Sequence, residues 1–117
     1  MRPGTPVVFG EVLFDHFQDG TKVLGGAPFN VAWHLQGFGK KPLFISRVGA
    51  DAEGDDVLDR MRAWGMRTDG VQRDPSCSTG RVVVRIQDDE PSYTIEHPSA
   101  WDHIEPVVVP VQASVLY

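Results

Sequence analysis

A chain of 117 residues, of which 41% are hydrophobic, is long enough for one modest domain and too short for two of ordinary size. The net charge is -5 and the sequence has no basic run, so it lacks the positive surface charge that is typical of nucleic-acid-binding proteins. A single cysteine cannot form an internal disulfide, and the chain has neither a signal-length apolar N-terminus nor an apolar run of membrane-spanning length. We therefore expect a cytoplasmic protein that binds neither nucleic acid nor membranes.

The first predicted element is a strand at 6–12. This short apolar run is of the kind that is buried on both faces of a sheet. The polar residues that follow, Asp15, His16 and the pair Asp19-Gly20, are expected to end the strand.

A helix is predicted to begin at Pro28, since proline suits the first helical position. The apolar residues expected on one face of this helix are Val31, Ala32, Leu35 and Phe38. Gly37 and Gly39 are expected to end the helix, and a second buried strand follows at 42–49. A strand-helix-strand unit of this length implies a parallel pair of strands with a right-handed crossover.

A second helix is predicted to begin after Asp51, whose side chain can cap it, and to end at Gly65. The apolar residues expected on its buried face are Val57, Leu58, Met61 and Trp64. Trp33 and Trp64 are expected to pack in the core or between helices. The alternation of strands and helices predicts the α/β class.

The segment 79–97 predicts a β-hairpin with its turn at 88–91. Alternation places Val82, Val84 and Ile86 on one face of the first strand, and Arg81 and Arg85 on the other, wetter face. Such a ribbon is barely stable alone and must lie against another part of the protein. The C-terminal residues Val115, Leu116 and Tyr117 are typical of the opening of a further buried strand.

Five stretches occur in the order GEVLFD, GGAPFNVAWHLQGFG, RVGADAEGDDVL, STGRVVVRI and PSAWDHI. Together they resemble the N-terminal part of the ribokinase-like (PfkB-type) carbohydrate kinases, and within that family the bacterial fructokinases. The resemblance implies a ribokinase-like α/β fold: a partial Rossmann-like parallel sheet with helices and a small β-hairpin lid. On this basis residues 1–117 are the N-terminal sugar-binding portion of a longer kinase, with the lid at about 79–97 and the C-terminal nucleotide-binding half missing.

The same resemblance implies that Asp15, Gly25, Gly26 and Asn30 hold the hydroxyl groups of the sugar. Glycines let a backbone approach a ligand closely, a helix start offers free N–H groups, and an asparagine amide both donates and accepts. Without the resemblance, the two glycines read as an ordinary turn and Asp15 as part of a solvated loop.

Tyr93 and Trp101 could present an aromatic face to a sugar, although packing in the core is the stronger interpretation of both. His97, Asp102 and His103 lack the spacing of a metal site and predict a surface loop. Arg47 is expected to pair with a neighbouring carboxylate. Cys77 has no activating partner and is expected to be an exposed bystander.

By resemblance, the parent protein is a fructokinase-like enzyme that transfers a phosphoryl group from ATP to a sugar hydroxyl and requires Mg²⁺. The sequence contains neither the family's Gly-Ala-Gly-Asp motif nor a phosphate loop of the Gly-x-x-x-x-Gly-Lys-Ser/Thr type. We therefore expect the isolated chain to be inactive, to contain no catalytic residue and to bind neither ATP nor a metal ion. The expected partners are a sugar and a second copy of the chain, paired through the lid.

Two alternatives stay open. The chain can be a non-catalytic fragment that binds a carbohydrate or dimerises, or its parent can phosphorylate a nucleoside or a sugar acid.

Overall fold

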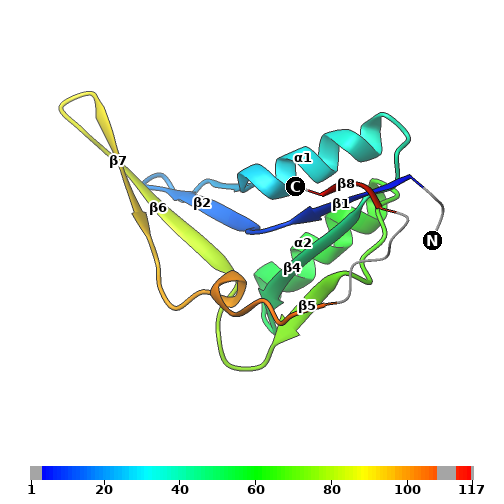
Figure 1. The fold of residues 1–117 in the computed structure, drawn as a ribbon. Helices are drawn as coiled ribbons and strands as arrows, with labels where there is room; N and C mark the ends of the chain where they lie inside the picture. Colours follow the sequence, from blue (N-terminus) through cyan, green and yellow to red (C-terminus); the bar gives the residue numbers. More distant parts are fainter. Residues whose placement is uncertain (1–3, 108–112, 117) are drawn as a thin grey trace.

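The computed structural model describes residues 4–107 and 113–116, which form two four-stranded sheets (Figure 1). In chain order the elements are β1 (Thr5–Phe9), β2 (Leu13–Phe17), β3 (Lys22–Gly25), α1 (Ala27–Gly37), β4 (Leu43–Gly49), α2 (Ala52–Ala63), β5 (Val71–Asp74), β6 (Gly80–Gln87), β7 (Glu90–Ile95), the 3₁₀ helix η1 (Ala100–His103) and β8 (Ala113–Leu116). The predicted α/β class is confirmed.

The first sheet has the strand order β5-β4-β1-β8, and all of its strands are parallel. Helices α1 and α2 pack against it and share one hydrophobic core with it. The buried members of this core are Val8, Val12, Phe14, Phe29, Ala32, Phe44, Val48, Val57, Leu58, Met61 and Met66. Among the described residues, no helix is both long and apolar enough to cross a bilayer.

The second sheet has the order β3-β2-β6-β7 and extends away from the first (Figure 1). We call it the lid sheet, after the lid that the sequence resemblance implies. It consists of two antiparallel hairpins, β2-β3 and β6-β7, whose inner strands β2 and β6 pair in parallel. The predicted hairpin is therefore confirmed, and its turn is the pair Asp88-Asp89, both with positive φ. The β6-β7 ribbon needs another part of the protein to lie against, and it pairs with the β2-β3 hairpin. That second hairpin was not predicted.

The first predicted strand was wrong in its bounds. Strand β1 ends at Phe9, and Asp15 and His16 lie inside β2 instead of ending a strand. The break comes at Gly10, whose φ is 147° and where a Cβ atom would stand 2.5 Å from Cγ of Pro28. The pair Asp19-Gly20 ends β2 instead of the first strand, and it makes the turn between β2 and β3, where Asp-Gly is a strong hairpin signal.

Both helices form where they are predicted, but two apolar side chains lie elsewhere than expected. Phe38 is the C-cap of α1 and is 79% exposed, and Trp64 is the C-cap of α2 and is 44% exposed. Trp64 instead stacks on Trp33, with ring centroids 5.1 Å apart, and its Nε1–H donates to the Trp33 carbonyl oxygen. The two tryptophans therefore connect α1 to the C-terminal end of α2, as the helix-packing interpretation predicted.

The predicted C-terminal strand is present as β8, which pairs in parallel with β1. Tyr117, the last residue of that prediction, lies outside the described residues.

Candidate functional site

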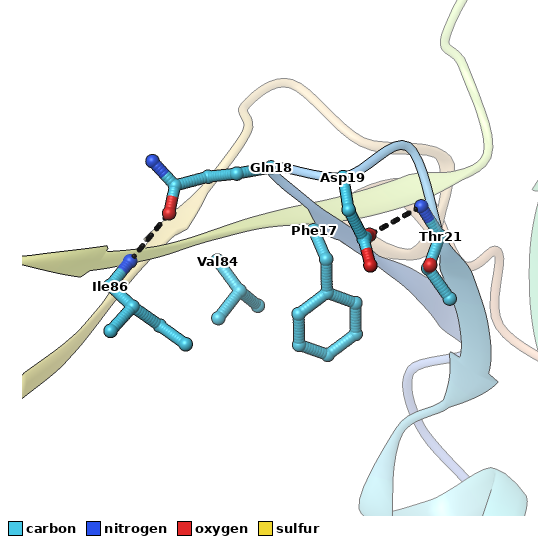
Figure 2. Close-up of a pocket in the computed structure, with 6 residues that line it drawn as sticks. All are labelled: Phe17, Gln18, Asp19, Thr21, Val84 and Ile86. Atoms are coloured by element: carbon cyan, nitrogen blue, oxygen red, sulfur yellow. Dashed lines mark hydrogen bonds between the residues drawn. The ribbon is translucent and has the colours of Figure 1, made fainter. Parts of the chain in front are cut away.

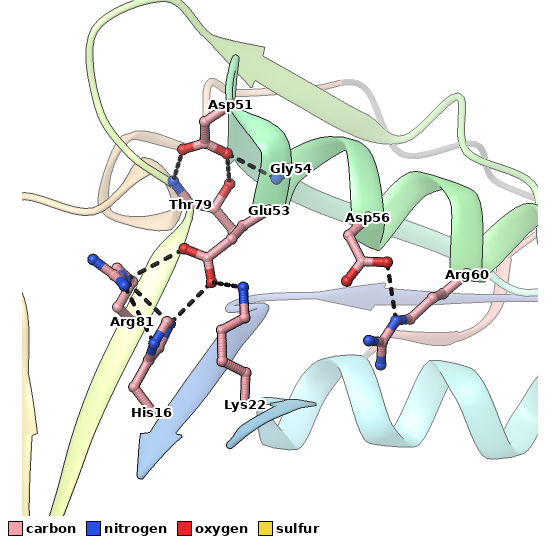
Figure 3. A network of polar contacts seen from close by, with 9 residues as sticks. All are labelled: His16, Lys22, Asp51, Glu53, Gly54, Asp56, Arg60, Thr79 and Arg81. Atoms are coloured by element: carbon pink, nitrogen blue, oxygen red, sulfur yellow. Dashed lines mark hydrogen bonds and ion pairs between the residues drawn. The ribbon is translucent and has the colours of Figure 1, made fainter. Parts of the chain in front are cut away.

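The side chain of Asp51, the predicted cap of α2, links the lid sheet to the first sheet and its two helices. We call this first sheet with its helices the α/β domain. Its Oδ1 accepts from the Gly54 N–H at 2.7 Å and from the Thr79 hydroxyl at 2.7 Å, and its Oδ2 accepts from the Thr79 N–H at 3.0 Å (Figure 3). The Thr79 hydroxyl in turn accepts from the Gly49 N–H at 2.9 Å. One carboxylate therefore starts α2 and holds the residue before β6.

Burial raises the pKa of Asp51, but the hydrogen bonds from Thr79 and Gly54 and the charge of Arg73 outweigh it, so the pKa lies below its ordinary value. The carboxylate is thus ionised at neutral pH, and it accepts its three hydrogen bonds as an anion.

Arg47 lies on β4 next to the paired strand β5, and its Nε donates to Asp74 Oδ2 at 2.9 Å. Asp74 also accepts from the N–H groups of Ser76 and Cys77, each at 2.8 Å, through Oδ1. The Cys77 N–H, the Arg47 guanidinium and the Ser76 N–H hold the pKa of Asp74 far below its usual range. The prediction that Arg47 pairs with a neighbouring carboxylate is confirmed.

The register of the lid sheet shows which side chains accompany Asp15. Asp15 pairs with Val82 on one side and with Val23 on the other. Because paired residues point to the same face, Asp15 shares its face with these two valines. Gly25, which is two residues from Val23 on β3, faces the same side. A Cβ atom on Gly25 would lie 3.9 Å from Asp15 Oδ2, so the carboxylate stands directly beside the Gly25 backbone.

Within the described part of the chain, the Asp15 carboxylate has no hydrogen-bond or ion-pair partner. Its side chain is half-buried. A carboxylate in such a place is acceptor-only and can take protons from two hydroxyl groups.

Gly26 is the N-cap of α1, with φ 104° and no side-chain cap. A Cβ atom there would stand 2.9 Å from the carbonyl oxygen of Glu11, so glycine alone lets the helix start against the chain between β1 and β2. Asn30 closes the first turn by donating its N–H to the Gly26 carbonyl at 2.9 Å.

The structure thus brings Asp15, Gly25 and Gly26 together where β2, β3 and the start of α1 meet. Asn30 lies one helical turn farther on and is exposed. It lines a hollow of about 150 Å³ together with Leu24, Phe29, Trp33 and Arg60. Leu24 faces away from the side of β3 that carries Gly25, so this hollow is distinct from the surroundings of Asp15.

The two aromatic candidates differ. Tyr93 pairs with Val84 and is 66% exposed, so its expected packing in the core is wrong. Trp101 lies in η1 over Gly80, where a Cβ atom would stand only 2.6 Å from its Cδ1. The Trp101 Nε1 atom is buried and has no partner among the described residues, and the ring of His97 lies edge-on at 6.0 Å.

The Asp15 face of the lid sheet continues outward as an apolar surface. A pocket of about 420 Å³ is lined by Phe17, Gln18, Asp19, Thr21, Val84 and Ile86 (Figure 2). Ile86 in this lining and Tyr93 and Ile95 beside it on the same face are each about half exposed or more. Phe17 was not predicted to contribute to this surface. The Asp19-Gly20 turn signal that follows it indicates a strand ending near Phe17.

Comparisons with known proteins agree with these features. The model of the "pfkB family carbohydrate kinase" matches residues 7–107. "Probable fructokinase-5" of Arabidopsis thaliana is 31% identical over 98 residues, which are 73% of this chain and 30% of that protein. This chain therefore spans under a third of the length of the curated relatives it matches.

Two solved structures are similar as well. Fructokinase of Halothermothrix orenii has a TM-score of 0.79 and 31% identity over 87% of this chain and 40% of its own. Fructokinase of Xylella fastidiosa with bound ATP has a TM-score of 0.75 and 29% identity over 86% of this chain and 35% of its own. With a family match over most of its length and the ribokinase-like fold, this chain belongs to the pfkB family of carbohydrate kinases.

Proposed function

We propose that this chain forms the sugar-binding site and the lid of a carbohydrate kinase that transfers a phosphoryl group from ATP to fructose or a closely similar sugar. The observation that carries the proposal is the Asp15 carboxylate beside Gly25 and Gly26, which has no partner among residues 4–107 and 113–116, in a chain of the pfkB family. Neutral polyols are recognised by fixed donors and acceptors, and this place offers a carboxylate, the start of a helix without a side-chain cap, and close access to backbone.

The proposed division of labour leaves the chemistry to other parts of the parent protein. Phosphoryl transfer requires a base for the attacking hydroxyl and cations for the charge on the phosphate. The described residues contain no cluster of three or more side chains that could hold a metal ion, so no Mg²⁺ ligand is assigned here. ATP use is supported by the family and by the ATP complex of the Xylella fructokinase. The isolated chain is proposed to bind sugar without turnover.

The direct test is a calorimetric titration of the chain with fructose, ribose, a nucleoside and a sugar acid, without nucleotide. We expect fructose to bind with a dissociation constant in the millimolar range, because a half-site without its nucleotide side forms only part of the contacts. Binding of the nucleoside or the sugar acid in place of fructose would select the alternative kinases. The absence of binding by all four compounds would contradict the proposal.

The alternative of a dimerising chain is favoured by the apolar lid face and is compatible with sugar binding. Exposed apolar surfaces of this kind, next to the free edge of β7, promote pairing of two copies. We propose a homodimer through this face.

Ile86→Asp should shift the chain from dimer to monomer in sedimentation velocity, because the charge would be buried in the paired faces. Phe38→Asp is the matched control, since Phe38 is equally apolar and 79% exposed but lies at the end of α1. A monomeric wild-type chain, or an equal effect of the two substitutions, would rule out pairing through the lid.

A further inference from the structure

Glu53, in the first turn of α2, faces three basic side chains that come from three strands of the lid sheet (Figure 3). Its Oε2 lies 2.9 Å from Nε2 of His16 on β2 and 3.9 Å from Nζ of Lys22 on β3. Its Oε1 lies 3.3 Å from Nε of Arg81 on β6. The Glu53 and His16 side chains are only 18% and 17% exposed, so their contact is shielded from solvent.

The imidazole of His16 lies between Glu53 and Arg81. Its Nε2 is within hydrogen-bond distance of Glu53 Oε2, while Nε and Nη2 of Arg81 lie 3.1 Å from its Nε2 and 3.2 Å from its Nδ1. Arg81 thereby binds both the carboxylate and the imidazole. The lid strands are tied to α2, and through α2 to the α/β domain.

The position of His16 next to Asp15 connects this cluster to the sugar site. The two residues are neighbours on β2, so their side chains point to opposite faces of the lid sheet. His16 on the back and Asp15 on the front are carried by the same short piece of backbone. Any rotation of β2 relative to α2 moves the Asp15 carboxylate relative to the start of α1.

We propose that Glu53 is a positioning residue, which binds His16 and Arg81 on the back of the lid sheet and so fixes where Asp15 stands in the sugar site. The functional part of this inference rests on the proposed sugar binding by Asp15. The mechanical part, that Glu53 holds β2, does not.

The test uses charge reversal and its rescue. In Glu53→Lys the new cation faces His16, Lys22 and Arg81, and β2 should loosen from the domain. We expect amide hydrogen exchange in β2 to become faster and the affinity for fructose to fall about tenfold, because small displacements of a binding group have large effects. Adding Arg81→Glu to Glu53→Lys restores an opposite-charge pair and should recover most of both losses.

The rescue separates positioning from a role within the helix. Glu53 also lies in the first turn of α2, where the negative charge of an acidic residue interacts favourably with the helix dipole and stabilises the helix. Changing Arg81 cannot repair that contribution. Asp59→Asn is the control, because it removes an exposed acid of the same helix, 3.5 Å from Arg62, and should change neither readout.

The outcomes are distinct. Unchanged exchange in Glu53→Lys, or failure of the double variant to recover, would overturn the inference. If the wild-type chain bound no sugar, the proposed function would fail, and the exchange data would still decide whether Glu53 holds β2. Unchanged fructose affinity despite faster exchange would show that the position of β2 does not control the site, and would overturn the functional part.

Discussion

Asp15→Asn should lower the affinity for fructose by about 100-fold or more, because two charge-assisted hydrogen bonds, each contributing about 1.5 to 3 kcal/mol, lose their ionic acceptor. Asparagine keeps the shape of the side chain but replaces one acceptor oxygen with a donor NH₂ group. Calorimetric titration of the wild-type and variant chains measures the difference.

The free energy of unfolding of Asp15→Asn should stay the same or rise slightly, whereas its affinity for fructose falls. The Asp15 carboxylate is half-buried and has no protein partner in the described part of the chain, so the substitution breaks no contact within the described structure. We expect the urea midpoint of Asp15→Asn to equal or slightly exceed that of the wild type, as is common when a binding residue is removed.

The control for Asp15 is Asp69→Asn, which removes an exposed carboxylate paired with Arg67, away from the lid sheet. This surface pair contributes little to stability, and affinity for the sugar should not change. If Asp15→Asn bound fructose as tightly as the wild type does, the sugar site would have to lie elsewhere in the chain.

Gly54→Ala is expected to have the largest effect on stability. In an isolated helix the substitution would stabilise by about 1 kcal/mol, because alanine is the better helix former. In this structure a Cβ atom on Gly54 would stand 2.1 Å from the carbonyl oxygen of Gly49 and 3.1 Å from the Thr79 hydroxyl. The backbone at the start of α2 would have to move away from Asp51 and Thr79.

We therefore expect Gly54→Ala to lower the free energy of unfolding by about 3 kcal/mol, the sum of overpacking and weakened hydrogen bonds at the Asp51 junction. Urea unfolding followed by fluorescence would measure the change. Hydrogen exchange at Thr79 and Gly80 should increase in parallel.

Gly37→Ala is the matched control, since Gly37 is also helical and its Cβ atom would meet only Cζ2 of Trp64, at 3.3 Å. That ring is partly exposed and can shift by the few tenths of an ångström required, so the variant should be about as stable as the wild type. A Gly54→Ala chain that was equally stable would show that the junction tolerates a Cβ atom and that the lid attachment is not tightly packed.

Local sequence patterns predicted most elements that depend on neighbouring residues. Helix α2 has Asp51 as its N-cap, whose carboxylate accepts from the Gly54 N–H. Gly65, with φ 85°, follows the C-cap of this helix. The β6-β7 hairpin has the predicted alternation, with Val82 and Val84 buried. Such features are encoded within a few residues of one another, by periodicity and by capping.

The candidate site could be predicted only in part. The motif residues Asp15, Gly25 and Gly26 were predicted from a resemblance. Their proximity follows from the β2-β3 register, which was not predicted because Asp19-Gly20 was interpreted only as the end of the first strand. Glu53 gave no signal at all. An acidic residue in the first turn of a helix is ordinary, and its partners His16 and Arg81 are 37 and 28 positions away.

Short patterns are enough to predict the α/β class, the two helices, the β6-β7 hairpin and the family motifs. Three features appear only once the chain is folded: β2 pairs in parallel with β6, Asp15 and His16 face opposite sides of that sheet, and Asp51 joins the lid sheet to α2. The physical reason is that these contacts bring together distant segments, whose pairing depends on the whole fold and leaves no local periodicity to recognise.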